Sequence, residues 1–303
     1  MLAWEAGVVY YFNFGEQGNM APQEIWTTLK ILAWTREYLS AKGVDNARLE
    51  AEWLLCHALG LDRVGLYLNF DKPLNEKELA AYRTLVARRG RREPLQHILG
   101  TQEFMGLEFE VSPDVLVPRH DTETLVNEAV ARRPVARSIV DIGTGSGCIA
   151  VMLARLLPNA TVTATDVSAA ALTVAQHNAV RHGAAIEFLH GSLFEPLAGR
   201  RFDLVVSNPP YIPSGDIAGL EPEVRDYDPA GALDGGPDGL DFYRTLVAQA
   251  PAHLEPGGWL LFEVGIGQAA GVIELLRAQG FEKLTVAKDP SGIERVVGGG
   301  MHG

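Results

Sequence analysis

Short apolar segments alternate with amphipathic helical segments from Ser138 to the end of the chain, and this alternation limits the possible folds most strongly. Strands that are covered by helices on both faces read as nearly continuous apolar runs. The alternation therefore predicts an α/β fold with a mostly parallel, seven-stranded sheet. Ligands in such sheets bind beyond the carboxyl ends of the strands, where the strand order reverses. The expected strands lie at 138–143, 161–167, 186–191, 202–208, 258–265, 284–289 and 294–299, and the expected helices at 148–157, 169–182, 240–254 and 268–279.

The segment from 22 to 93 has a purely helical pattern, in which apolar residues recur at helical spacing. Asn46 and Asn75 each precede an expected helix, as N-cap residues do. Leu29 and Trp53 lie on apolar stripes and are expected in the core. The pattern predicts a small helical domain over 22–93.

Two further boundaries follow from changes in pattern. Residues 94–118 alternate like two short strands with Gly106 at the turn, which predicts a β-hairpin linker. The α/β domain is then expected over 119–303. Residues 1–21 show no clear period, and we expect a poorly ordered extension.

The composition bears on the compartment and on partners. The formal net charge is −12, which disfavours a protein that binds mainly to the phosphate backbone of DNA. Cys56 and Cys148 stand in apolar contexts and are expected to be buried thiols, which fits the cytoplasm. We expect no metal and no membrane partner. A basic cluster forms either a solvated face or a contact for a nucleic-acid-bound partner, and it comprises Arg88, Arg89, Arg91 and Arg92.

A glycine-rich segment at 141–147, Asp-Ile-Gly-Thr-Gly-Ser-Gly, lies between an expected strand and an expected helix. Its glycines let the backbone approach a ligand closely at the helix N-terminus. Cys148 stands where a dinucleotide fingerprint has its third glycine, and no Walker lysine follows, so neither of those motifs is matched. Asp166 ends the next strand and can accept hydrogen bonds from both hydroxyls of a ribose. Loop and acid together indicate a nucleoside, although Asp166 could instead cap the following helix.

A second motif, Asn208-Pro209-Pro210-Tyr211, follows an apolar strand. Proline has no N–H, so the backbone carbonyls of this segment stay available to a ligand, and the Asn208 side-chain oxygen is a further acceptor. Together they can bind both hydrogens of a planar NH2 group, and the Tyr211 ring can stack on it. The motif therefore suits a nitrogen conjugated to a π-system, either an amide or the exocyclic amine of adenine.

In these motifs the chain resembles the class I S-adenosylmethionine-dependent methyltransferases, a Rossmann-like family. The resemblance implies that the glycine loop holds the amino-acid end of the cofactor and that Asp166 holds its ribose. Ser192 and Leu193 would flank the adenine, with Ser192 where many relatives have aspartate. The implied cofactor residues are Asp141, Gly143, Thr144, Gly145, Ser146, Gly147, Asp166, Ser192, Leu193 and Asn208.

The segment 94–123 narrows the resemblance, because it looks very like the linker of the protein-glutamine N5-methyltransferases that modify peptide chain release factors. His120 replaces the usual proline of that element. The helical domain and the loop after Tyr211 resemble the same family, and the resemblance implies that the helical domain 22–93 docks the substrate. The implied substrate is the glutamine of the Gly-Gly-Gln motif in class-1 release factors. A ribosomal-protein glutamine and the N6 of adenine are the alternatives.

Four features have open roles. Arg119 and Glu123 either bind the substrate or serve as a surface pair or a helix N-terminal acid. Glu263, at the end of a strand, either belongs to the site or is structural. The loop 214–241 contains eight acids and one arginine, and is either a solvated loop or a mobile acidic lip that faces a basic protein.

Overall fold

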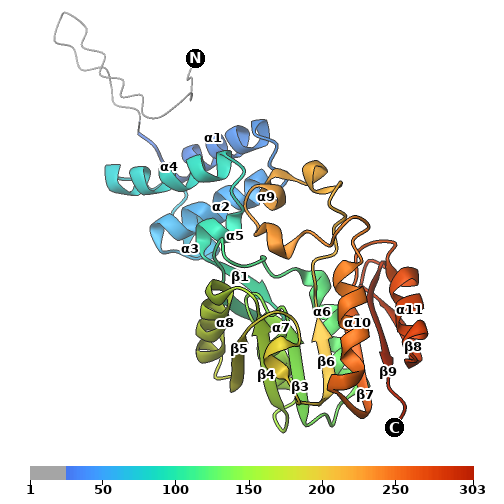
Figure 1. Cartoon of the computed structure of the whole chain (residues 1–303). Helices are drawn as coiled ribbons and strands as arrows, with labels where there is room; N and C mark the ends of the chain where they lie inside the picture. Colours follow the sequence, from blue (N-terminus) through green and yellow to red (C-terminus); the bar gives the residue numbers. More distant parts are fainter. Residues whose placement is uncertain (1–24) are drawn as a thin grey trace, which may run out of the picture. The chain divides into compact units, whose positions relative to one another are not determined.

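The computed structural model describes residues 25–303, so the extension expected over 1–21 lies outside the described residues. The chain divides into two compact units, and the boundary between them in the sequence lies between Arg91 and Arg92. Figure 1 shows the helices of the first unit and the sheet of the second. Each unit is described separately below.

The first unit is helical and comprises α1 (Thr28–Ala41), α2 (Ala47–Leu59), α3 (Arg63–Leu68) and α4 (Glu76–Gly90). The N-cap predicted at Asn75 is confirmed, since its side chain and that of Glu78 form a reciprocal capping box. The cap predicted at Asn46 is wrong in part. Asn46 occupies the N-cap position of α2, but its backbone (φ −97°, ψ 37°) is not extended and its side chain caps nothing.

The core of the helical unit uses a different face from the one expected. Helix α1 buries Ile31 and Leu39, whereas Leu29 is 60% exposed. Helix α2 packs through small residues such as Ala51, so Trp53 turns outward and is 42% exposed. The predictions that Leu29 and Trp53 are core residues are therefore wrong, because α2 buries a different side, which includes Ala51, Leu54 and Leu55.

The second unit begins with α5 (Leu95–Leu99) and a hairpin of β1 (Thr101–Phe104) and β2 (Leu107–Glu110). Both turn residues, Met105 and Gly106, have positive φ, as a two-residue hairpin turn of type I′ requires. The predicted hairpin is confirmed. The chain then enters the 3-10 turn η1 (His120–Thr122) and α6 (Glu123–Arg132).

A seven-stranded sheet forms the centre of the second unit, in the order β5-β4-β3-β6-β7-β9-β8. The pairs from β5 to β7 are parallel, and β9 runs antiparallel to both β7 and β8, so the predicted mostly parallel sheet is confirmed. The strands are β3 (Ser138–Ile142), β4 (Thr161–Asp166), β5 (Ile186–His190), β6 (Phe202–Ser207), β7 (Leu254–Glu263), β8 (Glu282–Lys288) and β9 (Glu294–Gly300).

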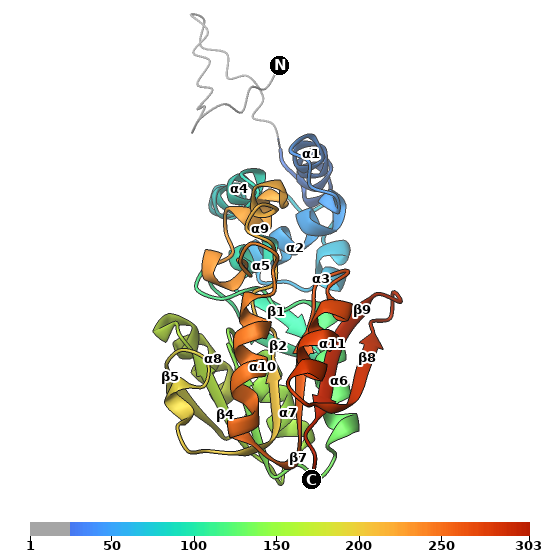
Figure 2. The ribbon, with the colours of Figure 1, turned by 45° about the vertical axis from the view of Figure 1, so that its right-hand side comes forward.

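Helices cover both faces of this sheet, because neighbouring strand residues point to opposite sides. Ile139 belongs to a core cluster with residues of α6 and α7, and Val140 belongs to a second cluster with residues of α10 and α11. Figure 2 shows α10 lying along its face of the sheet. The remaining elements are α7 (Cys148–Leu156), α8 (Ala169–Arg181), η2 (Glu195–Leu197), η3 (Ile217–Gly219), α9 (Pro222–Arg225), η4 (Ala230–Ala232), α10 (Asp241–His253) and α11 (Ala269–Ala278).

Candidate active site

Four strands deliver the candidate residues to one edge of the sheet. Ile142 at the end of β3 pairs with Thr165 of β4 on one side and with Ser207 of β6 on the other. Ser207 in turn pairs with Phe262 of β7. Because parallel strands lie about 4.8 Å apart, the residues that follow these pairs converge. The glycine loop, Asp166, Asn208 and Glu263 therefore meet where the strand order reverses.

The glycine loop adopts a conformation that its glycines make possible. Gly143, Gly145 and Gly147 all have positive φ (72°, 54° and 80°). A Cβ on Gly143 or Gly145 would meet no atom within 4 Å, so this side of the loop is open to a ligand. A Cβ on Gly147 would lie 2.9 Å from Cβ of Ala175, so this glycine serves the close packing of α7 on α8.

Asp166 is tied to the glycine loop. Its Oδ2 accepts a hydrogen bond from the Gly145 N–H (2.9 Å), and its Oδ1 accepts one from the Ser168 N–H (2.8 Å). The alternative expected from the sequence, that Asp166 only caps the next helix, is incomplete, since Ser168 itself caps α8. Each carboxylate oxygen keeps a lone pair for a ligand.

Asp141 is fully buried at the end of β3, below the loop. Its Oδ2 accepts a hydrogen bond from the Thr144 hydroxyl (2.6 Å), and its Oδ1 has no partner in the described part of the chain. Burial raises the pKa of Asp141 to about 7, with Thr144 opposing the rise and the Asp166 charge adding to it. An unpaired buried acceptor beside an open loop suits a ligand that donates hydrogen bonds.

The residues expected beside an adenine follow β5. Leu193 has a positive φ of 48°, and its carbonyl accepts a hydrogen bond from the Thr165 hydroxyl (3.3 Å) on the neighbouring strand. Ser192 is exposed, and its N–H lies 3.4 Å from Glu195 Oε2. The structure thus brings both residues to the same edge as Asp166.

Asn178 is a residue that the sequence analysis missed. It is fully buried on α8, and its Nδ2 donates to the carbonyls of Ser146 and Glu110 (both 2.9 Å). Its Oδ1 accepts from the Glu110 N–H (2.7 Å). One side chain therefore fastens the glycine loop to the β-hairpin. An asparagine on a helix carries no signal of such a role in the sequence.

The Asn208-Pro-Pro-Tyr segment leaves the end of β6 and is enclosed by glycines. Cβ atoms on Gly235 and Gly265 would lie 2.7 Å and 3.0 Å from atoms of Tyr211, so the loops around this tyrosine approach closely because they lack side chains. Gln268 Nε2 donates to the Tyr211 carbonyl (2.7 Å). Burial raises the pKa of Tyr211 to about 12, so its hydroxyl stays protonated.

Glu263 ends β7 beside this segment and is 1% exposed. Burial raises the pKa of Glu263 to about 7, and hydrogen bonds from Thr122 and Asn208 oppose that rise. Arg295 of β9 lies close by and forms an ion pair with Asp121 (2.8 Å). Because Ser207 pairs with Phe262, Glu263 lies next to Asn208 on the adjacent strand. Asp121 and Thr122 belong to the segment 94–123 that the sequence analysis singled out, whereas no motif had indicated Arg295.

Arg119 and Glu123 have separate partners in the structure. Arg119 Nη2 contacts the buried Asp228 Oδ2 (3.0 Å), and Glu123 Oε1 accepts from the Met105 N–H (3.2 Å) in the hairpin turn. They do not form the surface pair with each other that was one expectation, whereas Glu123 lies in the first turn of α6, as expected of a helix N-terminal acid. Their role toward a substrate stays a prediction.

The acidic loop 214–241 is not a lip of free charge. Arg92 contacts Glu223 (2.6 Å) and Glu221 (3.1 Å), Asp228 contacts Arg119, and Asp234 accepts from the Ser214 hydroxyl (2.6 Å). Asp226 pairs with Arg225, and Asp238 and Asp241 both pair with Arg244. Seven of the eight acids thus already have donors from this unit, which weakens the expectation that they face a basic protein.

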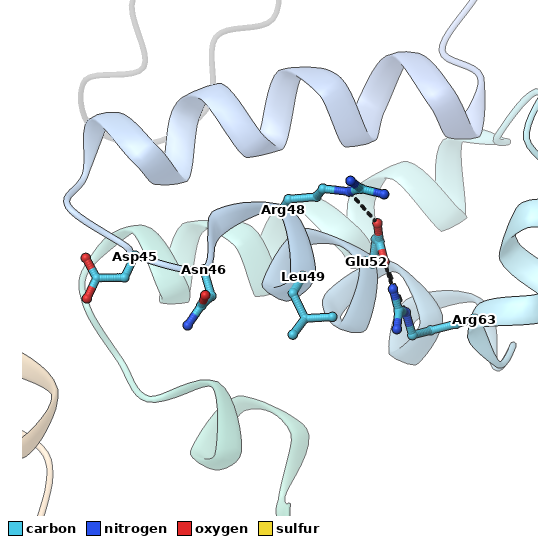
Figure 3. A pocket seen from close by; sticks show the side chains of 6 residues that line it. All are labelled: Asp45, Asn46, Arg48, Leu49, Glu52 and Arg63. Carbon is cyan, nitrogen blue, oxygen red and sulfur yellow. Dashed lines mark hydrogen bonds and ion pairs between the residues drawn. The ribbon is translucent and has the colours of Figure 1, made fainter. Parts of the chain in front are cut away.

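The helical unit contains a shallow pocket of about 440 Å³ and an arginine that departs from expectation. Figure 3 shows the pocket, whose lining includes the buried Glu52 held between Arg48 (3.2 Å) and Arg63 (2.6 Å).

Arg89, expected on a solvated face or a partner surface, is 4% exposed and paired with Glu50. The basic cluster is therefore split, because Arg89 serves the interior of the helical unit.

Two family models match the chain. One is described as PrmC N-terminal domain and matches residues 30–100, and the other as methyltransferase small domain and matches residues 120–218. The release factor glutamine methyltransferase of Geobacter sulfurreducens is 63% identical over 276 residues, which cover 91% of this chain and 97% of that protein. The chain belongs to the release factor glutamine methyltransferase family. The resemblance seen in its motifs is thereby confirmed.

Other members of the release factor glutamine methyltransferase family align over similar lengths. Those of Chlorobaculum tepidum and Moorella thermoacetica are 41% and 45% identical, and the alignments cover 91% and 85% of this chain and 98% and 92% of theirs. Among solved structures, the catalytic domain of hMettl16 in complex with a 3′UTR hairpin matches with a TM-score of 0.54 at 19% identity, over 72% of this chain and 82% of that one. At this identity the match shows the fold alone. None of the helices over 25–303 is both long and apolar enough to cross a membrane.

Proposed function

We propose that this methyltransferase moves the methyl group of S-adenosylmethionine to the side-chain amide nitrogen, N5, of the glutamine in the Gly-Gly-Gln motif of class-1 peptide chain release factors. The observation that carries the proposal is the placement of Asn208 directly beside the glycine loop, on neighbouring strands of a chain whose relatives are named for this activity. Action in the cytoplasm and the absence of direct DNA binding stay predictions.

The residues at the sheet edge fit the methyl donor. Gly143 and Gly145 leave open space above the loop, and the unpaired Oδ1 of Asp141 can accept a hydrogen bond. We assign the amino-acid end of the donor to the loop 143–147, the ribose hydroxyls to Asp166, and the adenine to Ser192 and Leu193. S-adenosylmethionine supplies an electrophilic methyl group on a sulfonium.

The acceptor segment then addresses the weak nucleophilicity of an amide nitrogen, whose lone pair is delocalised into the carbonyl. The Asn208 oxygen and a backbone carbonyl of the segment accept the two N–H groups and favour positive charge that develops on nitrogen. The nitrogen forms its bond to the methyl carbon as the carbon–sulfur bond breaks, and a proton leaves nitrogen afterwards. Most of the rate gain comes from positioning, and the Tyr211 ring offers a flat face for the planar amide.

We further propose that the helical unit docks the release factor. Several large apolar side chains are exposed on this unit, and such side chains mark interaction surfaces when they gather. They are Leu49, Trp53, Val64, Tyr67, Leu68 and Phe70. A protein partner can cover them, whereas a nucleic acid would need a basic surface there.

The proposal is tested with methyl-labelled S-adenosylmethionine and four acceptors: a purified class-1 release factor, the same factor with its Gly-Gly-Gln glutamine replaced by alanine, ribosomal protein, and DNA. We expect label in the first only, with peptide mapping placing it on the glutamine N5. Label in the alanine variant, or in ribosomal protein or DNA instead of the release factor, would refute the proposed substrate.

A further inference from the structure

The orientation of the Asn208 amide decides whether the acceptor segment can work. An asparagine side chain has an oxygen that accepts and an NH2 group that donates, and a rotation of about 180° exchanges them. A substrate NH2 group offers only donors at this position. Asn208 must therefore present Oδ1 and turn Nδ2 away, and something in the protein has to enforce that choice.

Groups that can accept a hydrogen bond lie beside Nδ2. Nδ2 lies 3.4 Å from the Thr122 hydroxyl oxygen. Because Ser207 of β6 pairs with Phe262 of β7, Asn208 and Glu263 are the next residues along adjacent parallel strands. Glu263 is buried, with Oε2 lacking a partner in the described residues. With Nδ2 turned toward Thr122, Oδ1 is left to a ligand.

We propose that Glu263, together with Thr122, is a positioning residue that holds Asn208 with Nδ2 toward the protein and Oδ1 toward the substrate amide. This inference rests on the proposed function, since it concerns how the same site binds an NH2 group. An ionised carboxylate can only accept hydrogen bonds, so it rejects the wrong orientation of Asn208, in which Oδ1 would face it. A neutral amide or acid at 263 could also donate and would tolerate both orientations.

The burial of a carboxyl group here is costly, and its surroundings control its charge. Five charged or titratable groups from separate segments interact with this carboxyl. Arg295 attracts its negative charge and Asp121 repels it. The other three are Tyr211, Tyr243 and Cys148. Burial raises the pKa of Glu263 to about 7. Protonation turns an acceptor into a donor, so the orientation of Asn208 is enforced above about pH 7 and relaxed below it.

The test is Glu263→Gln, which keeps the size of the side chain and removes its acceptor-only character. We expect kcat to fall about tenfold or more, the scale of one hydrogen bond to a charged group. The KM for the release factor and the Kd for S-adenosylhomocysteine should stay within about twofold, because Glu263 is proposed to act through Asn208. The wild-type kcat should fall on the acid side with an apparent pKa near 7, and this limb should be absent in Glu263→Gln.

Asp289→Asn is the matched control. Asp289 is also buried and also contacts Arg295 (3.0 Å), so its variant removes a carboxylate from the same cluster without touching Asn208. It should keep the wild-type kcat and pH limb. Should Glu263→Gln not fold, as judged by circular dichroism, Thr122→Val removes the hydroxyl between the two groups and should lower kcat while the KM is kept.

Three outcomes would overturn the proposal: Glu263→Gln with wild-type kcat and pH profile, Asp289→Asn with the same defect, or a Thr122→Val variant with unchanged kcat. The comparison is made on whichever substrate the wild-type protein labels. A wild-type protein that labels another acceptor therefore overturns the proposed substrate while the role of Glu263 is still measured.

Discussion

Replacement of Asp166 by asparagine should weaken binding of the cofactor by an amount that follows from the two backbone bonds of this carboxylate. Oδ2 accepts from the Gly145 N–H and Oδ1 from the Ser168 N–H, so both oxygens already face donors. An asparagine must direct its NH2 group at one of these N–H groups, whichever way it is flipped. One hydrogen bond to a charged group is lost, and two donors face each other.

The loss of a hydrogen bond to a charged group costs about 1.5–3 kcal/mol. Because the proposed ribose contact uses the same oxygens, we expect the Kd for S-adenosylhomocysteine to rise by about 10- to 100-fold, at roughly 1.4 kcal/mol per factor of ten. Isothermal titration calorimetry measures this Kd. The melting temperature should fall as well, since the glycine loop loses an anchor.

Asp203→Asn is the control that separates the two effects. Asp203 accepts from the backbone N–H groups of Arg137 (2.7 Å) and Ser138 (3.1 Å) at the start of β3. Asp203→Asn therefore also removes a carboxylate that binds backbone N–H groups, but at the end of the strand opposite to the glycine loop. Its variant should lose stability but keep the wild-type Kd. Unchanged affinity in Asp166→Asn, or an equal loss in Asp203→Asn, would refute the reasoning.

Three further predictions concern the same edge of the sheet. Asn208→Ala should lower kcat by about 100-fold or more, the scale for removal of a positioned group that stabilises developing charge. Calorimetry should show the Kd for S-adenosylhomocysteine changed by only a few-fold. Normal turnover by this variant would exclude the proposed role of Asn208. Asn178→Ala leaves the Ser146 carbonyl and both backbone groups of Glu110 without their hydrogen-bond partner, so chemical denaturation should show about 2–4 kcal/mol less stability. A loss below about 0.5 kcal/mol would contradict the inference that Asn178 fastens the glycine loop to the hairpin. Burial raises the pKa of Asp141 to about 7 from its usual value of 3.8, so the folded state holds a proton that the unfolded chain releases, and the free energy of unfolding should fall as pH rises between about 4 and 7. Asp141→Asn should make that decline shallower, and an identical pH dependence would show that this carboxyl does not titrate as inferred.

The order of strands and helices was predictable because short segments rich in apolar and β-branched residues alternate with amphipathic helical segments, with turn signals between them. Helices expected at 148–157 and 169–182 occupy Cys148–Leu156 and Ala169–Arg181. The glycine loop and the Asn208 segment were predictable for a different reason, since glycine and proline restrict the backbone in ways that few other purposes explain. The role of such residues can therefore be predicted from the sequence itself.

Other residues carry no such reason. Trp53 was expected inside because it is large and apolar, but Ala51 takes the packing face of α2. Asn178 contacts the hairpin from α8, and Thr122 contacts Asn208, which follows β6, so both roles arise between segments far apart in the chain. Sequence periodicity describes one element at a time, so it cannot show which polar side chain closes a gap between two of them.

The acidic loop illustrates the same limit for charge. Counted along the sequence, eight acids against one arginine predict a strongly negative surface. In the structure Arg92, Arg119 and Arg244 come from outside the loop and neutralise five of those acids. An ion pair between these groups has little field beyond its immediate surroundings, because opposite charges a few ångström apart cancel at a distance. The net charge of −12 therefore overstates what a partner meets at this loop. The acceptors around Asn208 suit an amide and an adenine amine alike, so we expect the exposed apolar side chains of the helical unit to discriminate a protein from a nucleic acid.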